Sequence, residues 1–187
     1  MSDMTHTPNS PLDGAHFDGF AEIREIGPLG MITLRARHDM AALPAALQAA
    51  VGLAMPETRR MVMQGGKGVG WMSPDEWLLI LPYAEVATAL AAIETALKGQ
   101  HFLAVDVSDA RAVFRILGPK AAQVLMKLCP VDLANLAPGE FRRTRAAQVA
   151  AAFWREGDGF TLVSFRSVAD YVMQLLRHSA LPGSEIG

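Results

Sequence analysis

The chain is 187 residues long, with 51% hydrophobic residues, 19% charged residues and a formal net charge of -2. This length fits a single domain with one core. The near-zero charge gives no field that would attract nucleic acid, and every apolar stretch is interrupted before the roughly 20 residues that a membrane helix needs. We therefore expect a cytoplasmic protein with no nucleic-acid or membrane partner. The small charged share also leads us to expect that part of the apolar surface contacts another protein.

Three segments are expected along the chain. Residues 1–16 lack hydrophobic periodicity and contain Pro, Gly and Ser, which is typical of a flexible N-terminal arm. The polar start of this arm, residues 1–9, does not resemble a signal peptide. Residues 17–180 are predicted to form one α+β domain, and residues 181–187 a C-terminal tail.

The clearest helix pattern covers residues 84–98. Its apolar residues recur at spacings of four and three: Val86, Leu90, Ile93 and Leu97. Further helices are predicted over 40–51, over 119–128 and from Ser167 onward, where Ser167 and Asp170 have the spacing of a capping box. The segment from Ser73 to Glu76 has the same spacing and predicts one turn of helix before a buried strand.

Alternating apolar and polar residues predict strands between these helices. The predicted strands are 20–26, 31–37, 77–81, 101–107, 112–117, 144–154 and 160–165, with a strand-rich stretch after Gly52. The last two are expected to pair as a hairpin around residues 156–159. The order of strands and helices predicts an α+β fold, with ferredoxin-like split βαβ units on a mostly antiparallel sheet.

A glycine cluster between residues 65 and 70 suggests a phosphate-binding loop, but its spacing does not fit one. A P-loop needs Ser or Thr after its Gly-Lys pair, whereas Val69 follows the Lys67-Gly68 pair here, and Trp71 occupies the last glycine position of a dinucleotide-binding turn. The sequence therefore favours a mobile hairpin loop. Trp71, beside this loop, is a candidate for a partner contact, whereas Trp77 is expected in the core.

Metal and catalytic sites are not supported by residue spacing. The histidines are scattered along the chain: His6, His16, His38, His101 and His178. They lack the spacing of metal ligands, and Cys129, the single cysteine, is expected as a buried apolar residue. Asp106 and Asp109 could act as acid and base, but they flank Ser108 in a turn, where Asx-type hydrogen bonding explains them. We therefore predict no catalytic, cofactor-binding or metal-binding residues in this chain.

Three sequence blocks carry a resemblance to a known family. They are Ser73-Pro74-Asp75-Glu76-Trp77-Leu78-Leu79, then Val105-Asp106-Val107-Ser108-Asp109-Ala110-Arg111 running into Leu117-Gly118-Pro119, and Cys129-Pro130-Val131-Asp132-Leu133. In this order and spacing they resemble the gamma subunit of heterotetrameric sarcosine oxidase, from about Phe20 to the last helix. They are distantly similar to aminomethyltransferases (T-proteins), which implies part of that folate-binding fold. The Gly-Tyr-Thr-Gly-Glu stretch of that superfamily is replaced by residues 151–156, and its catalytic aspartate has no matching position.

The resemblance implies an accessory, non-catalytic subunit of a bacterial enzyme that oxidatively demethylates sarcosine. Such a subunit would dock chiefly on the alpha subunit and stabilise a heterotetramer that also contains beta and delta subunits. FAD, FMN, NAD and tetrahydrofolate would be held by the other subunits, and none by this chain. Two alternatives stay open: a free-standing folate-binding or one-carbon transfer protein, and a stand-alone regulatory ligand-binding domain.

Overall fold

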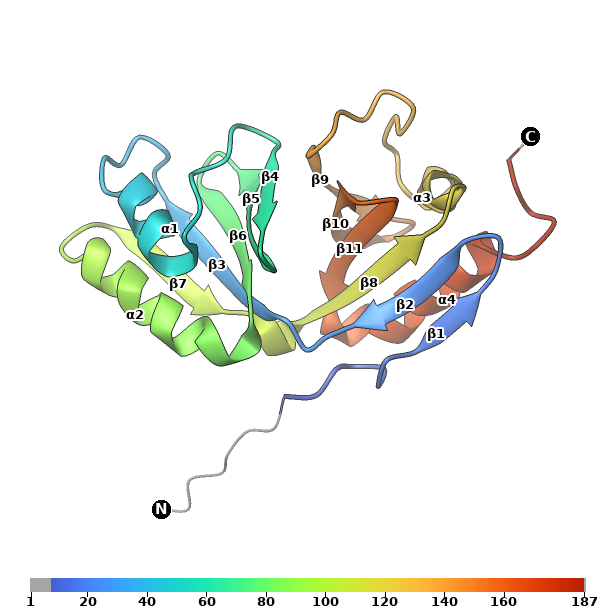
Figure 1. Ribbon diagram of the computed structural model, residues 1–187, viewed down its shortest axis with the longest axis horizontal. Coiled ribbons are helices and arrows are strands. Elements are labelled where there is room, and N and C mark those ends of the chain that lie inside the picture. Colours follow the sequence, from blue (N-terminus) through green and yellow to red (C-terminus); the bar gives the residue numbers. More distant parts are fainter. Residues whose placement is uncertain (1–7, 187) are drawn as a thin grey trace, which may run out of the picture.

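The computed structural model describes residues 8–186, which form two antiparallel β-sheets with two helices against each (Figure 1). The six-stranded sheet A has the spatial order β1 (His16–Asp18), β2 (Glu22–Ile26), β8 (Arg111–Leu117), β11 (Gly159–Phe165), β10 (Val149–Glu156) and β9 (Phe141–Ala146). The five-stranded sheet B has the order β4 (Met61–Gln64), β5 (Lys67–Ser73), β6 (Glu76–Leu81), β3 (Gly30–Ala36) and β7 (Phe102–Asp106). The helices are α1 (Leu43–Val51), α2 (Val86–Ala96), α3 (Ala121–Leu128) and α4 (Ala169–Ser179), with short 3-10 turns η1 (Tyr83–Glu85), η2 (Ser108–Ala110) and η3 (Arg166–Val168).

The α+β class predicted from the sequence is confirmed, but the strands form two antiparallel sheets instead of one. In sheet B, α1 connects β3 to the β4–β5 hairpin, and β6 lies between β5 and β3. A strand inserted between two helix-connected strands is the feature of a split βαβ unit. Among the described helices, none is long and apolar enough to cross a membrane.

The two sheets repeat one order of connections. The first runs β3–α1–β4–β5–β6–α2–β7, and the second runs β8–α3–β9–β10–β11–α4. In sheet A, the position next to β8 that corresponds to β7 is filled by β2, which comes from the N-terminal part of the chain. Ile23 of β2 pairs with Ile116 of β8, so the second sheet is completed by a strand that precedes the whole first sheet in sequence.

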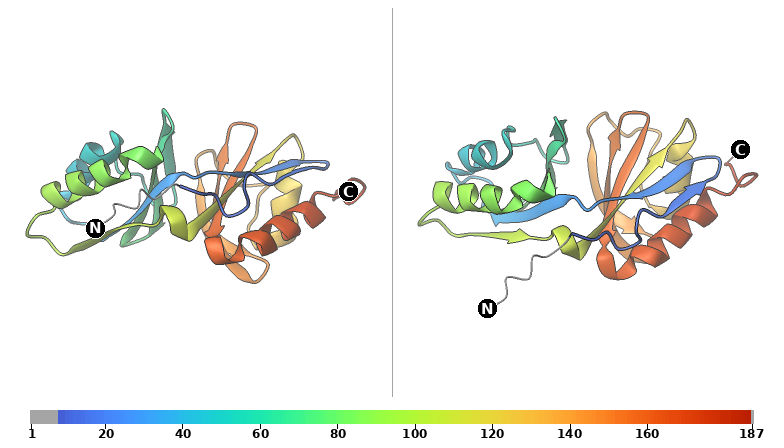
Figure 2. Two further views of the ribbon diagram at one scale, coloured as in Figure 1. Left: turned by 90° about the horizontal axis from the view of Figure 1, so that it is seen from below. Right: turned by 60° about the horizontal axis from the view of Figure 1, so that its bottom comes forward.

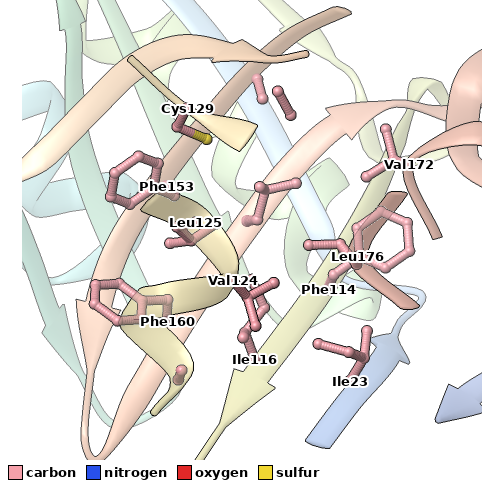
Figure 3. Packing of buried hydrophobic residues seen from close by; sticks show 14 of the residues in the cluster. Ile23, Phe114, Ile116, Val124, Leu125, Cys129, Phe153, Phe160, Val172 and Leu176 are labelled. Carbon is pink, nitrogen blue, oxygen red and sulfur yellow. The ribbon is translucent and has the colours of Figure 1, made fainter. Parts of the chain in front are cut away.

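Each sheet buries one face against its own helices. In sheet B, Ile32, Leu34 and Leu79 pack with α1 and α2 residues such as Leu47 and Ile93. The corresponding core of sheet A contains side chains from β2, β8, β10, β11, α3 and α4 (Figure 3): Ile23, Phe114, Ile116, Phe153, Phe160, Val124, Leu125, Val172 and Leu176. These residues alternate along their strands with residues of the opposite face, as expected from the period of a strand.

The helix-free faces of the two sheets pack against each other, so the two helix pairs lie on the outer sides of the molecule (Figure 2). This third cluster contains residues from both sheets: Met31, Met61, Leu78, Ile80, Val113, Phe141, Ala152, Trp154 and Val163. Phe141 and Trp154 stack with their ring centroids 5.7 Å apart. The edges meet as well, because Met61 N–H donates to the Gly139 carbonyl and Phe141 N–H to the Arg59 carbonyl.

The carboxylate of Glu25 on β2 holds the chain segment that precedes β1. It accepts hydrogen bonds from the Ser10 hydroxyl and the Gly14 N–H at 2.8 Å each, and from the Leu12 N–H at 3.3 Å. Glu25 is 4% exposed, so these bonds satisfy a carboxylate that is shielded from water. The contacts tie residues 10–14 to sheet A.

The helical turn predicted at Ser73–Glu76 is wrong. Ser73 and Glu76 are paired as neighbours across β5 and β6, and Pro74 and Asp75 form the turn between the strands. The carboxylate of Asp75 accepts from the Ser73 hydroxyl at 2.8 Å, so the polar residues of the expected capping box stabilise a hairpin turn. The buried strand expected after it is confirmed as β6.

Two other local predictions needed correction. The single strand expected over 144–154 is two strands, β9 and β10, separated by a turn in which Ala147 has a positive φ of 49°. The last helix begins at Ala169 without a side-chain cap, because Ser167 lies in the preceding 3-10 turn.

We expect removal of the Trp154 ring to destabilise the packing between the sheets. Trp154 is 1% exposed, and truncation of a buried aromatic residue leaves a cavity. Trp154→Ala should lower the free energy of unfolding by about 3–5 kcal/mol, measured by urea denaturation. Tyr171→Ala, at a side chain that is 43% exposed on α4, serves as the control and should change it by less than about 0.5 kcal/mol. A Trp154→Ala loss as small as that of the control would contradict this account of the sheet interface.

Candidate functional site

A cleft of about 240 Å³ lies between the two sheets, beside their shared apolar cluster. Its walls come from the helix-free faces: Met72 and Leu78 from sheet B, and Ala152 and Val163 from sheet A. Four charged residues line it: Arg35 on β3, Glu76 on β6, Arg111 on β8 and Arg143 on β9. The cleft is therefore an apolar space with a mainly basic lining.

The charged groups of the cleft differ in how they are compensated. Arg35 pairs with Asp75 at 2.6 Å, and Arg143 pairs with Glu76 at 3.3 Å. The Arg111 side chain makes no hydrogen bond or ion pair with any described residue, and its buried Nε has no partner there. Its guanidinium lies 4.4 Å from the centre of the Phe165 ring. The cleft thus holds one cation without a directly paired carboxylate.

Burial lowers the pKa of Arg111, and this desolvation is the largest effect on it. The Glu76 carboxylate acts in the opposite direction and Arg143 in the same direction. An arginine still remains charged at physiological pH, because its ordinary pKa lies far above neutrality. The lowered pKa therefore indicates a charge held in an unfavourable, poorly solvated place.

The residue types in the cleft suit binding better than catalysis. Ser164 carries the only hydroxyl among the residues that line it, and no histidine or cysteine lies among them. The Ser164 hydroxyl is directed to the Phe165 carbonyl at 3.4 Å, and Glu76 is already paired with Arg143. A nucleophile with an adjacent base, which acyl or group transfer would need, is absent from this lining.

Sequence reasoning missed this cleft because its residues do not form a motif. Arg35 appears only as a polar position in an alternating strand, and Arg111 and Arg143 lie just before the strands predicted from Ala112 and from Thr144. The available signal was weak, because each arginine shares its strand face with another polar residue: Thr33 with Arg35, Arg115 with Arg111, and Arg145 with Arg143. Only the pairing of two sheets brings them together.

The glycine cluster forms the hairpin that the sequence favoured. Gln64 and Lys67 pair across β4 and β5, and Gly65 and Gly66 form the turn with φ values of 59° and 79°. Two positive φ angles in a two-residue loop define a type I′ turn, which glycine adopts without strain. Lys67 Nζ lies 2.5 Å from Glu85 Oε2, so this lysine is engaged in an ion pair.

Trp77 is fully buried beneath α1 and α2, which confirms its predicted core position. Trp71 pairs with Trp77 across β5 and β6 and packs half-buried against the same core. Asp106 accepts from the Ser108 N–H at 2.9 Å and from its hydroxyl at 2.5 Å, which confirms the Asx-type turn. Asp109 lies apart from this pair of bonds and accepts from the Tyr83 hydroxyl at 2.8 Å.

The histidines do not gather into one site among residues 8–186. His38, His101 and His178 are each exposed, and His6 lies outside the described residues. His16 lies on the β1–β2 hairpin, with its Nε2 3.0 Å from Asp18 and 3.4 Å from Glu22. Glu22 also pairs with Arg24, so this group is explained as an exposed ion-pair network.

Comparison with solved structures identifies the type of fold. Aminomethyltransferase T of the glycine cleavage system from Bartonella henselae matches 81% of this chain and 44% of its own, with a TM-score of 0.62 and 15% identity. At this identity the likeness concerns the fold alone. The fold is therefore an aminomethyltransferase-like α+β fold.

Sequence comparison then identifies the family. The profile described as "Sarcosine oxidase, gamma subunit family" matches residues 35–181, and the chain belongs to this family. The sarcosine oxidase subunit gamma of Corynebacterium sp. strain U-96 is 33% identical over 175 residues, covering 84% of this chain and 82% of that protein. A chain of the heterotetrameric sarcosine oxidase from Corynebacterium sp. U-96, solved in complex with pyrrole 2-carboxylate, matches 86% of this chain and 83% of its own. Its TM-score is 0.77 and its identity 28%.

Cys129 is expected to be unreactive in the folded protein. It follows α3, is 5% exposed and packs in the core of sheet A (Figure 3). Burial raises the pKa of its thiol to about 12, so the reactive thiolate is scarce at neutral pH. A disulfide reagent at about pH 8, near the ordinary thiol pKa, should modify the unfolded chain rapidly and the native chain at least about a hundredfold more slowly. Equal rates in buffer and in concentrated guanidinium chloride would contradict this prediction.

Proposed function

We propose that this chain is an accessory, non-catalytic gamma subunit that docks on the alpha subunit of a heterotetrameric sarcosine oxidase and stabilises the complex. The observation that carries the proposal is the family match over residues 35–181. The relative from Corynebacterium sp. U-96 supports it, because its structure is that of a heterotetrameric sarcosine oxidase. In this proposal FAD, FMN, NAD and tetrahydrofolate are bound by the other subunits.

The outer strand β7 is the surface that we assign to docking. It is the last strand of sheet B, so one of its edges is not paired within the described chain. Leu103 and Val105 project from the same side of this strand and are 54% and 40% exposed. An unpaired edge with exposed aliphatic side chains is a surface that a partner can cover. Trp71 is a weaker candidate for this role, because it already packs against the core.

Co-expression with the alpha subunit tests both parts of this proposal. The wild-type chain should copurify with a tagged alpha subunit, whereas the double variant Leu103→Glu, Val105→Glu should copurify at least about tenfold less. Met126→Glu is a matched control, because Met126 is 40% exposed on α3, away from β7. Circular dichroism should establish that each variant is folded.

The outcomes of this experiment are distinct. A wild-type chain that never copurifies with the alpha subunit would overturn the subunit function. A double variant that copurifies as well as wild type would overturn only the assignment of β7. A larger loss with Met126→Glu would move the docking surface to the α3 side.

The alternative is a free-standing folate-binding or one-carbon transfer protein, favoured by the aminomethyltransferase-like fold. The residues do not support a folate site. The stretch 151–156 that replaces the superfamily's glycine-rich motif lies in β10, and Ala151 and Ala152 are buried there. At its end, Glu156 is paired with Arg115 at 2.7 Å and accepts from the Thr161 hydroxyl at 2.8 Å, so its carboxylate is engaged within sheet A.

We therefore expect the isolated chain to bind tetrahydrofolate weakly or not at all. Calorimetric titration should show no saturation at micromolar concentrations, with an aminomethyltransferase as the positive control in the same buffer. A micromolar dissociation constant, about -8 kcal/mol, would favour the folate-binding alternative instead.

A further inference from the structure

We propose that the cleft between the two sheets is a binding site for a small carboxylate with an apolar body, whose carboxylate pairs with Arg111. This site goes beyond the proposed subunit function, since neither docking nor assembly requires it. It is argued from the charge, the walls and the size of the cleft.

One of the three arginines that line the cleft has no carboxylate paired with it. Asp75 compensates Arg35, and Glu76 compensates Arg143. Arg111 is the remaining cation, and its Nε is buried without a partner among the described residues. Buried polar groups in folded proteins are nearly always hydrogen-bonded, and a buried charge normally has a counter-ion. One carboxylate in the cleft would supply the counter-ion of the Arg111 guanidinium, in the two-pronged geometry that arginine favours.

A single negative charge fits this arrangement better than two. The side chain of Glu76 is 13% exposed and already contributes one negative charge near Arg111. The second negative charge of a dianion would have no cation to pair with and would be repelled by the Glu76 carboxylate. The expected ligand class is a monocarboxylate.

The walls indicate an apolar body. Met72 and Leu78 face Ala152 and Val163 across the cleft, and Phe165 lies under the Arg111 guanidinium. The run of alanines in β10, Ala150 to Ala152, keeps side-chain volume low on one side. A space of about 240 Å³ is smaller than the roughly 300–1,000 Å³ of sites for drug-sized ligands, so it suits a single ring or a short branched chain. No nucleophile lines the cleft, so the ligand would be bound and released unchanged.

The first test uses benzoate as the probe and benzamide as its uncharged counterpart of the same shape. In ¹H–¹⁵N NMR of the full chain, benzoate should shift the Arg111 Nε–Hε signal and the backbone amides of Leu78 and Ser164 saturably, from both sides of the cleft. Benzamide should produce these shifts at least about tenfold more weakly, because it lacks the charge that pairs with the guanidinium. Shifts of equal size with both probes, or no saturable shift with benzoate, would overturn the proposal.

The second test removes the cation. Arg111→Gln should weaken benzoate binding at least about tenfold, whereas Arg145→Gln should leave it unchanged. Arg145 is a matched control because it lies on β9 two residues from Arg143 but outside the cleft lining, where it donates to the Ala147 carbonyl. Undiminished binding in Arg111→Gln, or an equal loss in Arg145→Gln, would overturn the proposal. If Arg111→Gln does not fold, the wild-type signals of Arg111, Leu78 and Ser164 still decide the outcome.

Discussion

The packing of the two sheets through their helix-free faces determines the rest of this structure. Each sheet is apolar on both sides: in β6, Trp77 and Leu79 face the helices while Leu78 and Ile80 face the other sheet. A strand that is buried on both faces reads as a continuous apolar run and needs a cover on each side. The helices cover one side of each sheet, and only the other sheet covers the second. Neither sheet could therefore expose its inner face to water without a large loss of buried apolar area.

The same packing creates the cleft. Where the two inner faces cover each other completely, side chains such as Trp154 and Phe141 pack together. Where the small alanine side chains of β10 leave space between the sheets, charged residues line the cleft. Arg111 is placed there by β8 and is partly removed from water. A charge in such a position is tolerated when the surrounding fold is stable enough to hold it, and unsatisfied groups of this kind often mark binding sites.

Much of the local structure could be predicted from the sequence, and the arrangement of the sheets could not. Periodicity identified α2, and the core position of Trp77 followed from its place in an apolar run. The strand order depends on contacts between distant residues, such as Ile23 with Ile116, which local patterns do not encode. Ser73 and Asp75 misled the prediction because the same side-chain hydrogen bonds stabilise helix ends and hairpin turns. The cleft was invisible for a related reason: Arg35, Arg111 and Arg143 come from three strands of two sheets.

The position of β2 also imposes an order on folding during synthesis. Sheet B is built from one contiguous stretch, from β3 to β7, so all its strands are present once residue 106 has been made. Sheet A cannot form from one contiguous stretch, because β2 is made before sheet B and its inner neighbour β8 is made only after the whole of sheet B. Until then, one edge of β2 carries backbone groups without their final partner, a state in which strands are prone to wrong pairing. The hairpin with β1, on the other edge of β2, limits that exposure to a single side while the ribosome completes the second sheet.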